Sequence, residues 1–136
     1  MANVSIIGAY NTQFGNFVKK NKDTGEITDL RSIYDLMLEA GRGAIADADI
    51  DPNDIDGVWV GSCAPGIFAD QEHLAAFAPE IAPEALRFKP MSRVEDACAS
   101  GSVAMYQALY ALESGRAKIA LVLGVLSRLA ALGYAG

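Results

Sequence analysis

One cysteine stands in a sequence context that suits nucleophilic chemistry. Cys98 lies between Ala97 and Ala99, where extended sequence containing Pro90 gives way to the charge-free and helix-favouring run 97–112. The unpaired amides and the positive dipole end of a helix N-terminus favour an anion. Such a position can lower the pKa of a cysteine thiol from about 8.5 to roughly 3.5–7.5. The sequence therefore predicts Cys98 as a thiolate nucleophile at a strand-to-helix turn, with small neighbours that let a substrate reach the sulfur.

The residues alone leave a second interpretation of Cys98 open. A free cysteine is among the most often buried residue types, so Cys98 could be a small hydrophobic residue in a tight contact between a helix and a strand. The nucleophile elbow of hydrolases uses a similar strand-to-helix turn, but its Gly-x-Ser-x-Gly sequence is absent here. Local sequence thus allows both a catalytic and a packing role.

Three other patterns mimic functional motifs and are rejected. The glycines of 41–46 imitate a dinucleotide fingerprint, but a helix rather than a strand precedes them. The alternating aspartates of 47–51 begin like a calcium loop, but Pro52 stands where glycine is required and Val58 where the bidentate glutamate should be. His73 is the only histidine and has no partner at metal-ligand spacing. We expect His73 to have a polar role on a helix surface.

The periodicity of apolar residues predicts alternating strands and helices, and hence an α/β fold. Asp29 is the expected N-cap of a helix over 29–48, and Gly115 is the expected stop of the helix that follows Cys98. The lysine-rich segment 17–28 is interpreted as an exposed connection rather than a phosphate-binding patch. We expect strands over 4–10, 55–62, 91–94 and 118–125, helices over 29–48, 71–82 and 97–112, and a loop over 64–68.

Composition and charge exclude several classes of protein. Hydrophobic residues make up 51% of the 136 residues and charged residues 21%, which excludes a disordered chain. The net charge of −6 provides no electrostatic footprint for nucleic acid or for an anionic membrane. The sequence shows no signal-peptide pattern, and its longest uncharged run is too short to span a bilayer. We therefore expect a cytoplasmic protein that binds neither nucleic acid nor membrane.

Four stretches resemble one enzyme family, in the same order along the chain. The segment 93–102, Arg-Val-Glu-Asp-Ala-Cys-Ala-Ser-Gly-Ser, resembles the nucleophile segment of thiolases, and within them the sterol-carrier-protein branch of acetyl-CoA acetyltransferases. This match is specific, whereas the others would be weak alone. The weaker matches cover 4–15, 55–61 with 64–68 and 71–73, and 115–125. The resemblance implies a thiolase N-terminal domain over 1–125, followed by a divergent apolar tail over 126–136.

The resemblance also implies a fold and a chemistry. The fold would be the N-terminal half of the thiolase-like fold, a layered α/β arrangement with a mixed β-sheet, in which the helix 97–112 is buried in a central layer. Cys98 would attack an acyl-CoA thioester and hold the acyl group as an acyl-enzyme thioester. Acyl-CoA would be the substrate, and neither a resident cofactor nor a metal is expected. Cys63, where relatives usually have a larger residue, is interpreted as a packing residue.

A non-catalytic alternative remains beside the acyltransferase. Thiolases are longer, and their second half supplies an activating histidine and a second cysteine that have no counterpart in this sequence. We therefore expect the chain alone to be inactive, whether it is a natural half-subunit or the product of a truncated or frameshifted reading frame. In the alternative, the chain is a truncated module that binds a partner or itself. The expected partners are a second copy of the chain or a separate C-terminal half.

Overall fold

A three-stranded parallel β-sheet forms the centre of the molecule in the computed structural model, which describes residues 3–15 and 17–125. The strands β3 (Gly57–Gly61), β4 (Met91–Val94) and β5 (Ala120–Gly124) lie in the order β4–β3–β5. Val58 of β3 pairs with Met91 on one side and with Leu121 on the other. Parallel neighbours need crossover connections, and helical segments provide them here. The layered α/β fold expected from the sequence is confirmed.

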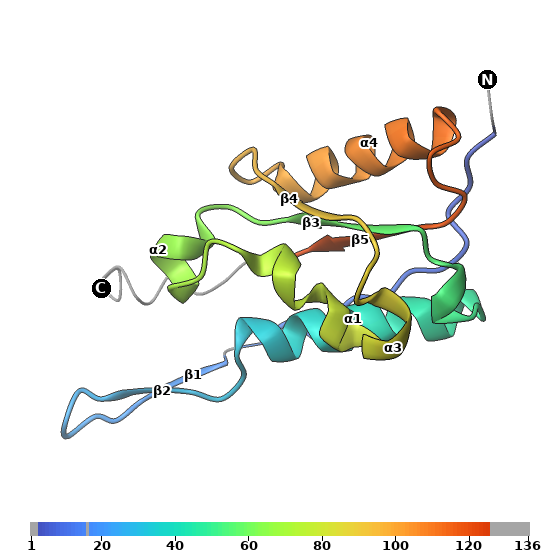
Figure 1. Cartoon of the computed structure of the whole chain (residues 1–136). Helices are drawn as coiled ribbons and strands as arrows, with labels where there is room; N and C mark the ends of the chain where they lie inside the picture. Colours follow the sequence, from blue (N-terminus) through green and yellow to red (C-terminus); the bar gives the residue numbers. More distant parts are fainter. Residues whose placement is uncertain (1–2, 16, 126–136) are drawn as a thin grey trace.

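Helices cover both faces of this sheet, as Figure 1 shows. The helix α4 (Ser100–Glu113) packs on β3 and β5 from one side. On the other side lie α1 (Ile33–Ala48), the 3-10 segment η2 (Leu74–Ile81) and the short α3 (Pro83–Leu86). The main hydrophobic core lies between the sheet and this second layer. Its buried members include Met37, Val58, Val60, Leu74, Leu86 and Leu121.

The helix α1 begins three residues later than the sequence suggests. Ser32 is its N-cap, because the Ser32 hydroxyl accepts from the Asp35 amide at 3.1 Å while the Asp35 carboxylate accepts from the Ser32 amide at 2.8 Å. This reciprocal capping box satisfies two helix-end donors at once. Asp29, the expected N-cap, instead ends the strand β2 (Ile27–Asp29). The buried stripe of α1 follows four-residue steps through Ile33, Met37, Gly41 and Ile45.

The glycines of the rejected dinucleotide fingerprint lie inside α1, where other parts of the chain pack closely against them. A Cβ added to Gly41 would lie 2.5 Å from the Ile81 side chain, and one added to Gly43 would lie 2.3 Å from the Tyr10 ring. The fingerprint requires glycines between a strand and a helix start. Its rejection is therefore confirmed, and both glycines admit neighbouring chain segments close to the helix.

The expected first strand over 4–10 is wrong. Residues 3–15 include no strand, and the segment runs beside α1 instead. The Ala9 amide donates to the Asp47 carboxylate at 2.9 Å, and the Tyr10 hydroxyl donates to Glu39 at 2.9 Å. Ile6 is 77% exposed. Strand-like composition forms a ladder only when a neighbouring strand supplies hydrogen bonds, and within the described residues none lies beside this segment.

The segment 17–28, expected as an exposed connection, is largely an antiparallel hairpin. Strands β1 (Val18–Lys20) and β2 pair so that Lys19 opposes Thr28. Asn21 and Gly25 build the turn, the latter with φ of 72°. The hairpin projects from the body of the molecule in Figure 1, and its lysines are exposed.

Two expectations for residues 64–82 also need correction. The expected loop contains a short helix, α2 (Pro65–Ala69), because Pro65 suits a first helical turn. The expected helix over 71–82 is the 3-10 segment η2, in which Pro79 has no amide hydrogen to donate. A second 3-10 turn, η1 (Pro52–Asp54), is capped by the Asp51 carboxylate, which accepts from the Asn53 amide at 2.9 Å. The rejected calcium-loop pattern thus includes a turn-capping residue.

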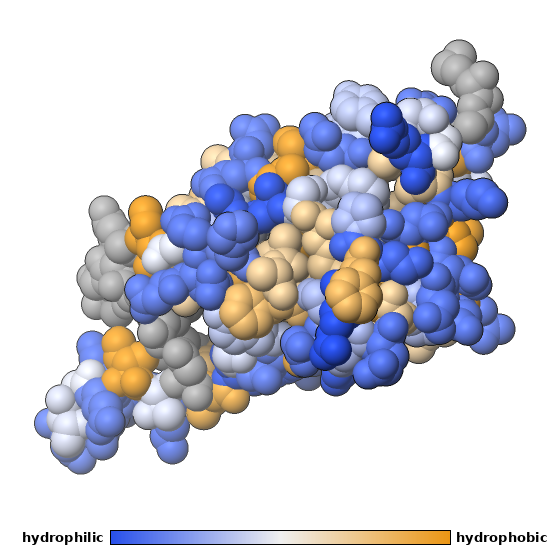
Figure 2. Space-filling model, viewed as in Figure 1, coloured by the Kyte–Doolittle hydropathy of each residue, from blue (hydrophilic) through white to orange (hydrophobic). Residues whose placement is uncertain are grey.

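The surface seen in Figure 2 is mostly polar, and its apolar side chains form small separate groups. None of the helices within residues 3–15 and 17–125 combines the length and the hydrophobicity that a bilayer crossing requires. The tail expected over 126–136 lies outside the described residues. The domain boundary at residue 125 therefore stays a prediction.

Candidate nucleophile site

Cys98 lies on an exposed turn between β4 and α4. The packing interpretation, in which Cys98 is a buried hydrophobic residue, is therefore wrong. Ala97, immediately before it, has a left-handed backbone with φ of 44°, which costs a non-glycine residue about 1–2 kcal/mol. Backbone strain of this kind persists only where the surroundings enforce it, and it is enriched at functional sites.

A buried serine hydroxyl enforces this turn. The Ser100 hydroxyl accepts from the Asp96 amide at 2.9 Å and donates to the Ala97 carbonyl at 2.7 Å. The Ala99 amide closes the same turn by donating to the Asp96 carbonyl at 2.8 Å. Ser100 is only 4% exposed, so water competes little for these bonds. Cys98 is thus carried at the tip of a turn whose two ends are joined by one side chain.

Glycines allow the first turn of α4 to lie very close to the ends of β3 and β5. A Cβ added to Gly61, at the end of β3, would lie 2.2 Å from the Ser100 carbonyl oxygen. Gly101 and Gly124 face each other, and a Cβ added to either would lie 3.7 Å from the other's Cα. A side chain at Gly61 would clash with the backbone of α4, so glycine at this position allows α4 to start against the end of β3.

The N-terminus of α4 has no side-chain cap. Its N-cap residue is Ala99, which has no acceptor for the first amides, although serine, threonine or aspartate usually fills this place. The helix starts at Ser100 rather than at 97, so Cys98 lies just outside its first turn. Helix N-terminal amides and the helix dipole favour negative charge. Because no side chain caps the first amides of α4, they can stabilise an anion near Cys98.

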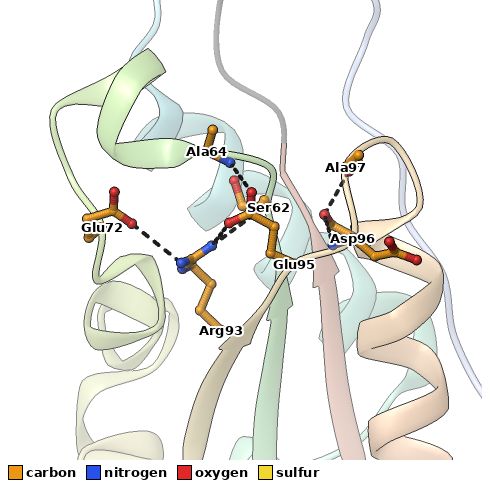
Figure 3. Close-up of polar contacts among 8 residues, drawn as sticks. Ser62, Ala64, Glu72, Arg93, Glu95, Asp96 and Ala97 are labelled. Carbon is orange, nitrogen blue, oxygen red and sulfur yellow. Dashed lines mark hydrogen bonds and ion pairs between the residues drawn. The ribbon is translucent and has the colours of Figure 1, made fainter.

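A charged cluster ties the chain before the turn to the loop after β3, as Figure 3 shows. Arg93 donates to the Ser62 carbonyl at 3.1 Å and to the Glu95 carboxylate at 2.6 Å, and lies 3.4 Å from Glu72. Glu95 also accepts from the amide of Ala64, whose φ is 42°. These hydrogen bonds, first that of Arg93 and then that of Ala64, lower the pKa of Glu95. Glu95 is therefore ionised and structural at neutral pH.

The other sequence-selected residues do not join Cys98. His73 is exposed at the start of η2 and borders a surface cavity of about 290 Å³, lined also by Glu72, Met91 and Arg93 but not by Cys98. This agrees with a polar surface role for His73. Cys63 is half-buried, and its thiol lies near enough to Glu95 to contribute slightly to the lowered pKa of that carboxyl. Its packing role is compatible with that position.

The sequence places Ser100 in the first turn after Cys98 and Glu95 in the nucleophile segment 93–102, but it predicts no contacts for them and marks Gly61 only as a strand end. Ser100 carried a usable signal, since a serine two residues after a candidate nucleophile can bond back to the turn. The bond between Glu95 and Ala64 and the contact between Gly61 and Ser100 carried none, because each joins residues that are far apart in the sequence. Only the fold brings these contributions together.

The two cysteines should differ in reactivity. We expect iodoacetamide near neutral pH to alkylate Cys98 at least several-fold faster than Cys63, because Cys98 is exposed beside an uncapped helix N-terminus and Cys63 is half-buried. Limited labelling followed by peptide mass mapping measures both rates in one sample. Equal labelling, or earlier labelling of Cys63, would contradict this prediction.

Sequence comparisons with known proteins point to one family. The model of the family "Thiolase, N-terminal domain" matches residues 4–128. An acetyl-CoA acetyltransferase of Methanocaldococcus jannaschii is 41% identical over 125 residues, which are 92% of this chain and 29% of that protein. The chain thus spans under a third of that relative's length.

Solved structures show a similar fold at low sequence identity. A 3-oxoacyl-[acyl-carrier-protein] synthase III from Aquifex aeolicus has a TM-score of 0.59 and 19% identity, covering 71% of this chain and 30% of that one. The Acat5 thiolase from Ascaris suum, solved in complex with coenzyme A, has a TM-score of 0.55 and 18% identity, covering 62% and 21%. At these identities the similarity concerns the fold alone.

Proposed function

The chain belongs to the thiolase family through its N-terminal domain, and from that premise we propose that it is the nucleophile-bearing part of a thiolase-type acyltransferase acting on acyl-CoA. The observation that carries the proposal is the exposed Cys98 on a strained turn before an uncapped helix. The name of the Methanocaldococcus relative, acetyl-CoA acetyltransferase, supports acetyl-CoA as the substrate class.

The proposed first step is transfer of an acyl group to Cys98. The Cys98 thiolate attacks the thioester carbonyl carbon, a new carbon–sulfur bond forms, and the bond to the sulfur of coenzyme A breaks. The coenzyme A thiolate leaves and takes up a proton. The N-terminus of α4 favours negative charge both on the sulfur and on the tetrahedral oxyanion. Transfer of the acyl group to a second acyl-CoA, or back to coenzyme A, would complete the reaction.

Protection against alkylation tests this proposal. Preincubation with acetyl-CoA should block later alkylation of Cys98, because its sulfur then carries an acetyl thioester. Hydroxylamine, which cleaves thioesters, should restore the labelling, while Cys63 serves as the internal control in the same chain. Labelling of Cys98 that acetyl-CoA leaves unchanged would count against the acyltransferase.

The exposed face of α4 favours a second candidate function, a module that binds another chain. Met105, Tyr106 and Tyr110 are each more than half exposed, and α4 buries only Ser100, Ala104 and Ala108. The expected burial of this helix in a central layer needs a second half, and within the described residues this face is uncovered. In this candidate function a second copy of the chain covers the Met105–Tyr110 face, since exposed apolar side chains grouped on one face mark contact sites.

Self-association through this face has a direct test. We expect a dimer or larger oligomer by light scattering at micromolar concentration. The double variant Met105→Glu with Tyr110→Glu should shift the mass towards the monomer, because it places charge on both ends of the face. A clean wild-type monomer would exclude the second copy and leave a different chain as the partner.

A further inference from the structure

The turn that carries Cys98 depends on one hydroxyl group with no other described role. Ser100 joins Asp96 and Ala97 through hydrogen bonds of 2.9 and 2.7 Å, and it is 4% exposed. The Asp96 amide precedes Cys98 by two residues, and the Ala97 carbonyl directly precedes it. Both bonds therefore tie the residues just before Cys98 to the buried hydroxyl of Ser100, two residues after it.

The hydrogen bonds of the Ser100 hydroxyl hold Ala97 in a backbone conformation that alanine does not favour. Ala97 has φ of 44°, and alanine leaves the left-handed region where nothing holds it there. The backbone of Ser100 is held against the sheet, because its carbonyl packs on Gly61 at the end of β3. Through its hydroxyl, Ser100 thus holds the turn in a fixed position relative to the sheet. A shift of about 1 Å at a reacting group can cost roughly 10²-fold in rate.

We propose that Ser100 is a positioning residue for Cys98, whose hydroxyl holds the Asp96–Ser100 turn so that the sulfur approaches an acyl thioester in the direction needed for attack. The inference rests on the proposed acyltransferase function. Ser100 bonds to the turn and is only 4% exposed, so its hydroxyl is shielded from a bound thioester. Its effect is therefore confined to reactions that need an oriented sulfur.

Comparing two reactions of the same thiol isolates that effect. Alkylation by iodoacetamide needs an exposed thiolate, whereas acyl transfer from acetyl-CoA needs a thiolate that is also aligned with a bulky bound thioester. A change in the thiolate fraction affects both rates equally and cancels in their ratio. We expect Ser100→Ala to lower the rate of Cys98 acetylation about 10- to 100-fold relative to its rate of alkylation.

Two further variants separate positioning from general damage. Ser102→Ala removes an exposed hydroxyl of the same helix and should leave the ratio unchanged. Ser100→Thr keeps a hydroxyl and should recover most of the lost acetylation. Melting curves check that each variant is folded. Equal falls in both reactions of Ser100→Ala, or a threonine variant as slow as the alanine variant, would overturn the inference.

Amide hydrogen exchange makes the inference testable apart from the proposed function. The Asp96 amide donates to the Ser100 hydroxyl, so Ser100→Ala should speed its exchange by about tenfold. If wild-type Cys98 is never acetylated, the acyltransferase proposal fails, and this exchange rate alone decides whether Ser100 holds the turn. Unchanged exchange at Asp96 would reject the role of Ser100 in either case.

Discussion

The pure chain, given acetoacetyl-CoA and coenzyme A, should produce acetyl-CoA at a rate about 10⁴- to 10⁷-fold below that of an ordinary thiolase. Losing one oxyanion-hole donor costs about 10²–10³ in rate, and losing a general acid or base about 10²–10⁴ more. Cys98 and the N-terminus of α4 can supply a nucleophile and part of the charge stabilisation. The only histidine, His73, borders a surface cavity that Cys98 does not line.

A thiolysis assay at high protein concentration measures this rate, with Cys98→Ala as the control for contaminating enzyme. We expect any turnover that depends on Cys98 to lie at least about 10⁴-fold below that of an ordinary thiolase, even where wild-type Cys98 is slowly acetylated. Turnover at ordinary enzyme rates that disappears in Cys98→Ala would show that these residues alone complete the reaction.

The variant Gly61→Ala should lose about 3 kcal/mol of unfolding free energy, with a melting temperature lower by about 10 °C. The added Cβ would lie 2.2 Å from the carbonyl oxygen and 2.5 Å from the carbonyl carbon of Ser100, and 2.7 Å from the Gly101 nitrogen. All three are backbone atoms, so no side-chain rotation relieves the contact. The start of α4 must therefore move away from β3.

A matched substitution controls for the general effect of replacing glycine. In Gly15→Ala the nearest atoms to the new Cβ belong to the Phe17 ring at 3.8 and 3.9 Å, an ordinary contact distance. We expect the unfolding free energy to change there by no more than about 0.5 kcal/mol. Similar melting curves for Gly61→Ala and wild type would show that the close approach between β3 and α4 is not required.

The strand-to-helix turn around Cys98 could be predicted because its signals are local. Pro90 disfavours helix before the turn, and the charge-free run after it has helical composition, so the junction is confined to a few residues. Gly115 likewise marks the end of α4, with φ of 72°. In both places, short-range backbone preferences agree with the final fold.

Other predictions failed where local patterns compete with tertiary contacts. Asp29 and Ser32 are both good N-cap residues. Ser32 is the N-cap because the Asp35 carboxylate completes a capping box with it. The apolar segment 4–10 has strand composition, but a strand also needs a neighbour. Its hydrogen bonds go instead to Asp47 and Glu39 of α1.

The surroundings of Cys98 could not be predicted residue by residue. The hydrogen bond between Ala64 and Glu95 joins residues 31 positions apart, and Gly61 meets Ser100 through backbone atoms. Neither contact leaves a spacing that sequence periodicity can detect. The candidate nucleophile is thus a local feature of the sequence, whereas the structure that holds it depends on long-range contacts.

The site of acetylation tests the central claim, that the turn makes Cys98 the acyl acceptor. The wild-type chain is treated briefly with acetyl-CoA and digested, and mass spectrometry locates the added acetyl group with and without hydroxylamine. We expect a hydroxylamine-sensitive acetyl group on the peptide containing Cys98, and none on the peptide containing Cys63. Acetylation that falls first on Cys63, or only on lysines as hydroxylamine-resistant amides, would contradict it.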